Sequence, residues 1–391
     1  MISNRELFLA NLAQTSSFPL GLEVERAEGN FLYGPDGKKY LDLISGISVS
    51  NVGHLHPTVI KAINEQLSKH MHLQVYGEYI QTPQVKLATK LVELLPNTIE
   101  SVYLVNSGSE AIEGAMKLAK RYTGRAEIVA FKNAYHGSSH GALSLMGNEE
   151  FKRPFRPLLP GIRHLDFNDE SQLSLITHKT AAVFIEPIQG EAGYKPADIA
   201  YLKALRKRCN QVGALLVFDE IQSGMGRCGH WFATYKYNVK PDIIVLAKGL
   251  GGGMPIGAFA SSKKIMDSFK SNPILGHITT FGGHPVSCAA ALGAITVLEE
   301  EQLIEQVYEK EKLFRKLLKH PAIKGITGSG LMLAVELESF EHVEATMHRC
   351  VEKGVIIDWF LFNSKCIRIS PPLTITKEDI AFACKTIMEC F

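Results

Sequence analysis

The sequence has no excess of charge of either sign and no apolar run long enough to cross a membrane. Its 42 Lys and Arg residues nearly balance its 40 Asp and Glu residues, which gives a formal net charge of +2. No basic tract is interleaved with aromatic residues, so the composition argues against a nucleic-acid-binding surface. A membrane-spanning helix needs about 20 consecutive apolar residues, and no such stretch occurs. We therefore expect neither nucleic-acid nor membrane partners.

Targeting patterns and metal-binding patterns are also missing. Residues 1–6 have neither the apolar core of a secretory signal nor the Arg- and Ser-rich, acid-poor composition of a transit peptide. The seven cysteines form no C-x-x-C pair, and their odd number and scatter favour reduced, mostly buried thiols in a cytoplasmic protein. The histidines of Gly53-His-Leu-His-Pro57 lack a third ligand nearby, so a structural turn is favoured over a metal site and we expect no metal.

The chain is long enough for two domains with a large core. It has 391 residues, of which 46% are hydrophobic and 21% charged, as in an ordinary globular protein. From about residue 58, helical segments alternate with short apolar runs, which is typical of a mostly parallel sheet covered by helices on both faces. Such sheets bind ligands at the carboxyl ends of their strands. The predicted strands are 102–105, 127–131, 162–165, 182–185, 214–218, 242–247 and 256–260.

The remaining segments predict a smaller domain of mixed helices and strands. They comprise a helical arm (5–15), a hairpin (31–33 and 39–43), a charged helix (298–319), two strand-like runs (331–337 and 366–369) and a final helix from about residue 377. We therefore divide the chain into an N-terminal arm and hairpin that packs with the small domain (1–57), a large domain (58–299) and a small C-terminal domain (300–391).

Two of the buried runs each deliver a charged group. Ala214–Phe218 leads to Asp219 and Gln222, and Asp242–Ala247 leads to Lys248, which a glycine-rich loop follows. Taken singly, a lysine is usually solvated surface and an aspartate after a strand is usually a turn residue. A carboxylate and an amine on neighbouring strands nevertheless suit pyridoxal phosphate (PLP). Its aldehyde forms a Schiff base with a lysine, and its ring nitrogen needs a carboxylate partner.

The start of one predicted helix suits a phosphate group. Ser107 and Glu110 fit an S-x-x-E capping box, and Gly124 suits the far end of the helix. An ordinary capped helix would explain these residues. Gly108 and Ser109 add unobstructed backbone N–H groups and a hydroxyl at the positive end of the helix, which is where anions bind.

Two further residues suit the faces of a planar ring. Tyr135 follows another predicted strand, where an aromatic side chain could belong to the core but could also stack on a cofactor. On the other face of the ring, a branched residue such as Ile221 would suffice.

Together these residues form six ordered motifs that resemble the class III PLP-dependent aminotransferases. This family includes the acetylornithine, ornithine, 4-aminobutyrate and other ω-amino-acid transaminases. The motifs are Asn106-Ser-Gly-Ser-Glu-Ala111, Tyr135-His-Gly137, Glu186-Pro-Ile-Gln-Gly-Glu191, Asp219-Glu-Ile-Gln222, Leu246-Ala-Lys-Gly249 and Thr279-Thr-Phe-Gly-Gly283. The resemblance extends from Gly29 to about Thr376. It implies an α/β chain of PLP-dependent transferase fold type I, with a mostly parallel seven-stranded sheet and a smaller α+β domain.

The resemblance also implies an activity and an assembly. The chain would move an amino group between an amino acid or amine donor and a 2-oxo acid, by a ping-pong mechanism with PLP. It would form a homodimer whose active sites lie at the subunit interface. Lys248 would be the Schiff-base lysine and proton carrier, and Asp219 would keep the ring nitrogen protonated; these two are the predicted catalytic residues. The other predicted cofactor-binding residues are Ser107, Gly108, Ser109, Tyr135, His136, Glu186, Ile221 and Gln222, with Thr280 supplied by the partner chain.

The resemblance assigns the substrate carboxylate to Arg368, because a guanidinium suits bidentate binding of a carboxylate. Glu191 matches the family glutamate that pairs with this arginine and releases it when a dicarboxylate arrives, so 2-oxoglutarate is the expected acceptor. A plain buried ion pair is the alternative for both residues. The sequence departs from the family at Ser138, where ornithine-type and 4-aminobutyrate-type enzymes carry arginine, and at Ile47, where the ornithine enzyme has tyrosine. An ω-amine with a less charged tail is therefore favoured, unless another arginine compensates. The candidates are Arg153, Arg156 and Arg163.

Two other functions share some of these features. Gly224-Met-Gly-Arg-Cys-Gly229 satisfies G-x-G-x-x-G and would suit a nicotinamide-dependent oxidoreductase, but an isolated match is weak and a polar insert separates it from the strand. A PLP-dependent aminomutase of the same fold would keep Lys248 and Asp219 and would need no 2-oxo acid.

Overall fold

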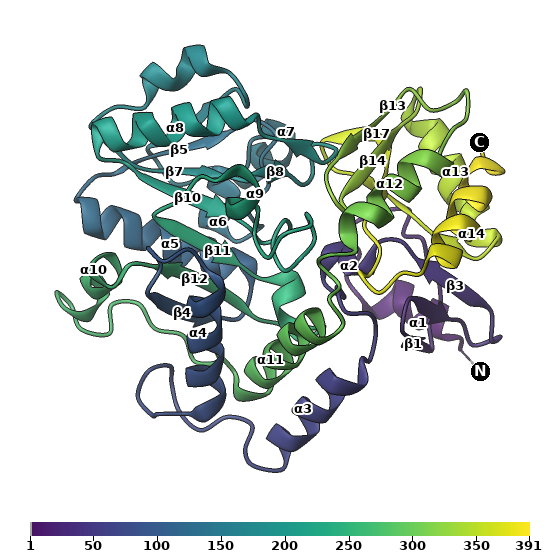
Figure 1. Ribbon diagram of the computed structural model, residues 1–391, viewed down its shortest axis with the longest axis horizontal. Coiled ribbons are helices and arrows are strands. Elements are labelled where there is room, and N and C mark those ends of the chain that lie inside the picture. Colours follow the sequence, from purple (N-terminus) through teal and green to yellow (C-terminus); the bar gives the residue numbers. More distant parts are fainter. Residues whose placement is uncertain (1) are drawn as a thin grey trace.

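A seven-stranded sheet forms the centre of the larger of two bodies in the computed structural model, which describes residues 2–391 (Figure 1). The strand order is β4-β12-β11-β10-β7-β5-β6. Only β12 is antiparallel to its neighbours, so the prediction of a mostly parallel seven-stranded sheet is confirmed. The strands are β4 (Ser101–Val105), β5 (Glu127–Phe131), β6 (Ile162–Leu165), β7 (Thr180–Ile185), β10 (Leu215–Asp219), β11 (Ile243–Leu246) and β12 (Gly257–Ser261).

Both faces of this sheet are covered by helices, and β11 and the part of β10 before Asp219 are apolar at every position. Along β10, Leu216 and Phe218 face a core shared with helix α8 (Ile199–Val212). Leu215 and Val217 face the opposite core, shared with helix α5 (Gly108–Thr123). Successive side chains of a strand point to opposite faces of the sheet. Because both faces are buried here, these runs are continuously hydrophobic in sequence.

The strand directions bring three chain segments to one edge of the sheet. Strand β10 ends at Asp219, and β11 ends just before Lys248. Strand β4 runs parallel to β11, because β12 between them is antiparallel to both. The start of α5, directly after β4, therefore lies at the same edge as Asp219 and Lys248, as expected for ligand binding in such sheets.

The second body combines the two ends of the chain. Strand β3 (Lys39–Asp42) of the predicted hairpin pairs with β2 (Phe31–Tyr33) on one side and with β15 (Val355–Ile356) on the other. Figure 1 shows the N-terminal segment in purple beside the yellow-green C-terminal elements. The sheet β13-β14-β17-β16 lies in the same body. The division at residues 57 and 299 stays a prediction. The other elements of this body are α1 (Asn4–Asn11), β1 (Arg26–Glu28), α12 (Val307–Leu317), β13 (Gly325–Gly328), β14 (Leu333–Glu336), α13 (Phe340–Glu352), β16 (Asp358–Phe360), β17 (Asn363–Ile369) and α14 (Lys377–Met388).

The predicted helix over 298–319 is wrong in its extent. Helix α11 (Pro285–Glu300) ends where that helix was expected to begin, and turns connect it to α12. Gln302 adopts a left-handed backbone (φ 49°), which breaks the helix. The buried side chains of Leu303 and Ile304 join the core from this turn.

The remaining elements are short or lie outside the central sheet. They are α2 (Ser45–Ser48), α3 (Pro57–Leu67), α4 (Thr82–Leu94), α6 (His140–Leu145), α7 (Glu149–Lys152), η1 (Arg153–Phe155), η2 (Glu170–Leu175), β8 (Ile188–Gln189), β9 (Lys195–Pro196), α9 (Ala233–Tyr237), η3 (Lys248–Gly251), α10 (Lys263–Met266) and η4 (Asp267–Lys270). Within residues 2–391, no helix has both the length and the apolarity needed to cross a membrane.

Candidate active site

A cavity of about 710 Å³ opens at the carboxyl edge of the sheet. It brings together most of the predicted site residues: Ser107, Gly108, Ser109, Tyr135, His136, Glu186, Glu191, Asp219, Ile221, Gln222 and Lys248. Two predicted site residues do not line it. Arg368 lies behind Glu191, which it contacts, and Thr280 is exposed in the loop before α11.

Asp219 is held at the bottom of the site by two hydrogen bonds. Its side chain is almost fully buried; Oδ1 accepts from the Ile221 N–H at 3.0 Å and Oδ2 pairs with Nδ1 of His136 at 2.7 Å. Burial alone would lower the pKa of His136, but the hydrogen bond and charge of Asp219 outweigh it and raise that pKa. The arrangement places a buried carboxylate beside an imidazole whose protonated form is favoured.

Lys248 follows β11 with a backbone that side-chain-bearing residues rarely adopt. Its φ is 49°, in the left-handed region, and it begins the single turn η3. Burial lowers the pKa of its amine from the usual 10.5, although the charge of nearby Glu191 acts against this shift. A lowered pKa favours the neutral amine, which is the nucleophilic and basic form.

The start of α5 is shaped by two glycines. A Cβ on Gly108 would lie 2.7 Å from the Ile221 side chain, so glycine lets these two residues approach each other. A Cβ on Gly257 would lie 2.1 Å from the carbonyl oxygen of Ser107, which fixes Ser107 against β12. Helix α5 thus points its N-terminus into the cavity, where an anion is stabilised.

The predicted capping box forms only in part. The Ser107 hydroxyl accepts from the Glu110 N–H at 3.2 Å, as predicted, and Gly124 ends the helix in a left-handed conformation. The Glu110 carboxylate, however, accepts from the backbone and side-chain N–H groups of Asn106 and not from Ser107. Asn106 offers a side-chain amide as well as its backbone N–H, so the Glu110 carboxylate binds this residue and not the backbone N–H of Ser107.

The sequence did not predict a chain of hydrogen bonds that begins at Ser109, in the first turn of α5. The Ser109 hydroxyl donates to Ser139 (2.7 Å), whose hydroxyl donates to the Glu113 carboxylate (2.6 Å). Glu113 also accepts from the Ala142 N–H at 3.0 Å. The spacing of Ser109 and Glu113, one helical turn apart on α5, is the only sequence signal for this chain.

Glu186 holds the segment that carries Tyr135. Its carboxylate is buried and accepts from the backbone N–H groups of Tyr135 (2.9 Å) and Gly190 (2.8 Å). Burial raises its pKa to about 7. The Tyr135 hydroxyl shares a hydrogen bond with Ser138 (2.9 Å), so the residue at the expected arginine position is tied to the ring-stacking candidate.

Arg368 and Glu191 form a buried ion pair, as predicted. Nη2 of Arg368 lies 2.7 Å from Oε2 of Glu191, and their side chains are 1% and 6% exposed. Burial alone would raise the pKa of Glu191, but the charge and hydrogen bond of Arg368 outweigh it and hold that pKa below 4.5. Arg368 also donates to the carbonyl of Trp359. Its Nη1 has no partner among residues 2–391, which leaves the two N–H groups of this atom for a ligand.

None of the three candidate arginines compensates for Ser138. Arg156 pairs with Glu149, and Arg163 pairs with Glu127. Neither these two nor Arg153 lines the cavity. Ile47 is partly buried and also lies outside the lining, where Val49 of the same segment takes a place instead.

Two motifs that could suggest other functions, Gly224–Gly229 for a dinucleotide and His54 with His56 for a metal, have structural roles instead. Residues 224–228 are buried, and a Cβ on Gly226 would meet Ile304 and Leu373, so this loop is packed against the core and leaves no room for a dinucleotide. Nε2 of His54 contacts Asp42 at 2.8 Å, and Nε2 of His56 contacts Glu301 at 2.9 Å. Over residues 2–391, no cluster of three or more His, Cys, Asp or Glu side chains could hold a metal ion.

The donor and acceptor set of the cavity fits PLP. An anion site at α5 and a buried carboxylate at Asp219 lie on the same cavity as the amine of Lys248. Gln222 Oε1 is buried without a hydrogen-bond partner in the described chain, which suits contact with a polar ligand. Tyr135 and Ile221 both line the cavity and are available for the two faces of a ring.

Comparisons with known proteins agree with this geometry. The family model for class III aminotransferases matches residues 12–391. The acetylornithine aminotransferase of Methanocaldococcus jannaschii is 41% identical over 93% of this chain and 92% of its own length, and that of Aquifex aeolicus is 38% identical over 95% and 97%. Among solved structures, the ornithine aminotransferase of Toxoplasma gondii superposes with a TM-score of 0.92 at 30% identity, covering 99% of this chain and 94% of that one. The chain therefore belongs to the class III aminotransferases, as a PLP-dependent enzyme of fold type I.

Proposed function

We propose that Lys248, Asp219 and Arg368 carry the two halves of a transamination between an ω-amine donor and a 2-oxo acid. The cavity that joins the amine of Lys248 to the carboxylate of Asp219 is the observation that carries this proposal. When bound, PLP supplies an aldehyde that takes up amino groups and a ring that accepts electrons.

Lys248 Nζ holds the cofactor between turnovers and moves the proton during turnover. Its lowered pKa supports both roles, because the neutral amine can bond to the aldehyde and, once the donor amine has displaced it, can accept the proton from the donor carbon. The same group returns the proton to the 2-oxo acid carbon in the second half-reaction.

Asp219 keeps the ring nitrogen protonated. Its Oδ2 pairs with Nδ1 of His136, whose raised pKa favours an imidazolium beside it. A carboxylate at the ring nitrogen favours the charged ring by direct pairing. Ser107, Gly108 and Ser109 would bind the phosphate, Tyr135 and Ile221 would cover the ring faces, and Gln222 would lie near the ring hydroxyl, since all of them line the cavity.

Arg368 and Glu191 sort the two substrates. Arg368 binds the α-carboxylate of 2-oxoglutarate when Glu191 moves away. When the donor has no carboxylate near Arg368, Glu191 stays in place and neutralises the charge of Arg368. The ion pair and the unpartnered Nη1 of Arg368 support this exchange. 2-Oxoglutarate and glutamate are accordingly the acceptor couple.

The donor is an ω-amine whose far end carries no free carboxylate. No arginine is among the residues that line the described cavity, and Ser138 occupies the position where a distal carboxylate would need one. N-Acetylornithine is the second candidate, because the curated relatives in the comparison are named acetylornithine aminotransferases at 37–41% identity.

A donor panel separates these candidates. The PLP form is mixed with a terminal diamine, 4-aminobutyrate, ornithine or N-acetylornithine, and conversion to the pyridoxamine form is followed spectroscopically. The diamine should react fastest, and Ser138→Arg should shift preference toward 4-aminobutyrate by about tenfold, as expected for a new charged hydrogen bond. Preference of the unmodified enzyme for N-acetylornithine would establish the second candidate. An aminomutase would turn over its substrate with no 2-oxo acid present.

The active enzyme is a homodimer to which each partner contributes Thr280. Large exposed apolar residues support this assembly, because they gather on 67–85 and 274–281, around Thr280 itself; they include Met71, Leu73, Ile80, Ile274, Ile278 and Phe281. Mixing inactive Lys248→Ala and Thr280→Ala subunits should restore one complete site per hybrid dimer. No recovered activity in verified hybrids would contradict a shared site.

The enzyme works in the cytoplasm. All seven cysteines are free and buried in the structure, which suits a reducing compartment. Fractionation of the native cells, with the enzyme followed by antibody, tests this placement.

A further inference from the structure

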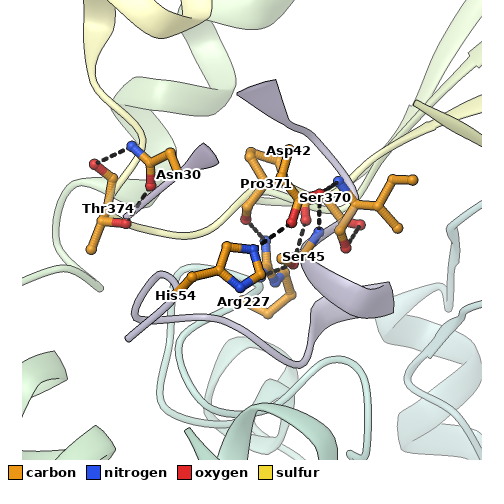
Figure 2. Close-up of polar contacts among 9 residues, drawn as sticks. Asn30, Asp42, Ser45, His54, Arg227, Ser370, Pro371 and Thr374 are labelled. Carbon is orange, nitrogen blue, oxygen red and sulfur yellow. Dashed lines mark hydrogen bonds and ion pairs between the residues drawn. The ribbon is translucent and has the colours of Figure 1, made fainter. Parts of the chain in front are cut away.

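Arg227 is a fully buried cation in the loop that follows β10, outside the cavity (Figure 2). Its side chain is 0% exposed, and the four hydrogen bonds recorded for it within residues 2–391 go to uncharged oxygens. Burial lowers its pKa to about 10. Burial of a guanidinium among uncharged groups carries a large desolvation penalty, which the four hydrogen bonds help to offset.

The guanidinium joins three segments that are distant in sequence. Nη1 donates to the carbonyls of Pro371 and Leu331, the latter at 3.2 Å. Nη2 donates to Oδ1 of Asn51 at 2.5 Å and to the hydroxyl of Ser45 at 3.3 Å. Figure 2 shows Arg227 pointing toward Pro371 and Ser45 between the N-terminal and C-terminal segments. One side chain of the large body thereby contacts a segment from the N-terminal part of the chain and two segments from its C-terminal part.

The contact of Arg227 with Pro371 connects these hydrogen bonds to Arg368. Pro371 lies three residues after Arg368, just beyond the end of β17. The intervening Ser370 is fixed as well, because its carbonyl accepts from Ser45 Oγ (2.7 Å) and its N–H donates to the Leu43 carbonyl (2.7 Å). The segment that positions the Arg368 guanidinium is therefore anchored by Arg227 directly and through Ser45.

The contact of Arg227 with Asn51 connects the same hydrogen bonds to the turn that begins at Lys248. A Cβ on Gly249, the residue after Lys248, would lie 2.5 Å from Nδ2 of Asn51, so Asn51 packs directly against that backbone. Asn51 also donates to the Met225 carbonyl at 2.9 Å and accepts from the Leu373 N–H at 2.7 Å. Asn51 is thus held from both bodies while it contacts the lysine-bearing turn.

We propose that Arg227 is a positioning residue that fixes the carboxylate-binding Arg368 relative to Lys248. It does so by tying the segment after Arg368 to Asn51 and Ser45. This inference rests on the proposed roles of Lys248 and Arg368. A substrate whose carboxylate is held by Arg368 reaches the amine only if that spacing is correct, whereas a donor without this carboxylate does not depend on it.

Arg227→Lys is the first test, because lysine keeps the charge but its single ammonium cannot reach four acceptors as a guanidinium fork does. In the holoenzyme, KM for 2-oxoglutarate should rise about tenfold to a hundredfold, as for a misplacement of about 1 Å. The half-reaction of a donor without a carboxylate at the Arg368 end should keep its rate within about threefold. Arg125→Lys is the matched control, because Arg125 also donates to three carbonyls, those of Thr180, Val212 and Gly213, but far from Arg368 in the fold.

Further variants keep every outcome informative. Ser45→Ala removes one contact of Arg227 and the contact to Ser370, so it should raise the same KM by a smaller factor; this variant decides the matter if Arg227→Lys does not fold. Equal loss in both half-reactions, or a lower melting temperature with an unchanged KM, would overturn the positioning role. Arg368→Lys separates the two proposals: if it leaves KM for 2-oxoglutarate unchanged, the assignment of Arg368 fails. If only Arg368→Lys raises that KM, the inference about Arg227 fails alone.

Discussion

Replacing Gly257 with alanine tests whether the phosphate-binding segment owes its position to strand β12. The added Cβ would lie 2.1 Å from the Ser107 carbonyl oxygen and 2.6 Å from its carbon, whereas real Cβ atoms almost never approach within 3.0 Å. The two backbones must separate by about 1 Å, and neither is a flexible side chain. Overpacking of this kind costs about 1–3 kcal/mol. If that cost falls on the start of α5, the Kd for PLP should rise about 5-fold to 150-fold, at 1.4 kcal/mol per tenfold change.

The assay is a spectroscopic titration of the apoenzyme with PLP, together with denaturant unfolding. Gly325→Ala is the matched control, because Gly325 also begins a strand and its nearest neighbour to a new Cβ is a Glu336 oxygen at 3.9 Å. The control should leave both quantities unchanged. An unchanged Kd for Gly257→Ala, with or without a loss of stability, would refute the idea that β12 positions the cradle.

Three further predictions concern charged groups of the site. Lys248→Ala should abolish the absorbance of lysine-bound PLP and lower turnover at least about a thousandfold, since both covalent attachment and proton transfer are lost; a coloured, active variant would contradict its role. Because Asp219 raises the His136 pKa, the stabilisation from this pair in the apoenzyme should be complete below pH 6.5 and should be lost as the pH rises through the raised value. His136→Asn should flatten that part of the curve of unfolding free energy against pH, and identical curves would argue against a charged pair. Glu191→Ala should lower the free energy of unfolding by about 3–5 kcal/mol by leaving Arg368 unpaired, measured with denaturant; a smaller loss than that of Glu28→Ala, which breaks an exposed pair with Arg26, would be inconsistent with a buried pair.

The central sheet could be predicted from the sequence because its strands are buried on both faces. A run such as Glu127–Phe131 has no helical periodicity and is bounded by turn residues, so its limits are visible in the sequence. The direction of β12 could not be predicted in this way, because a strand buried on both faces has the same pattern in either direction. The candidate residues at strand ends followed from the parallel direction of their strands, since parallel strands end at one edge.

Contacts between segments that are distant in the chain could not be predicted from the sequence. Nothing local relates Asn51 to Gly249 or Arg227 to Pro371, and these contacts depend on the packing of the two bodies. The composition of the charged segment after Glu300 favours a helix, whereas burial of Leu303 and Ile304 in the core requires a turn. Tertiary packing overrode local preference there.

The seven buried thiols offer an internal probe of how the protein opens. Burial raises the pKa of several of them, Cys209, Cys228, Cys288 and Cys384 among them, to about 12, so the native chain holds them as unreactive thiols. Cys228 lies directly after Arg227, whereas Cys384 lies on helix α14. An alkylating dye can therefore modify each position only when its own region exposes it to solvent. Mapping the order of modification by mass spectrometry would show whether the loop after β10 opens separately from the C-terminal helix or together with it.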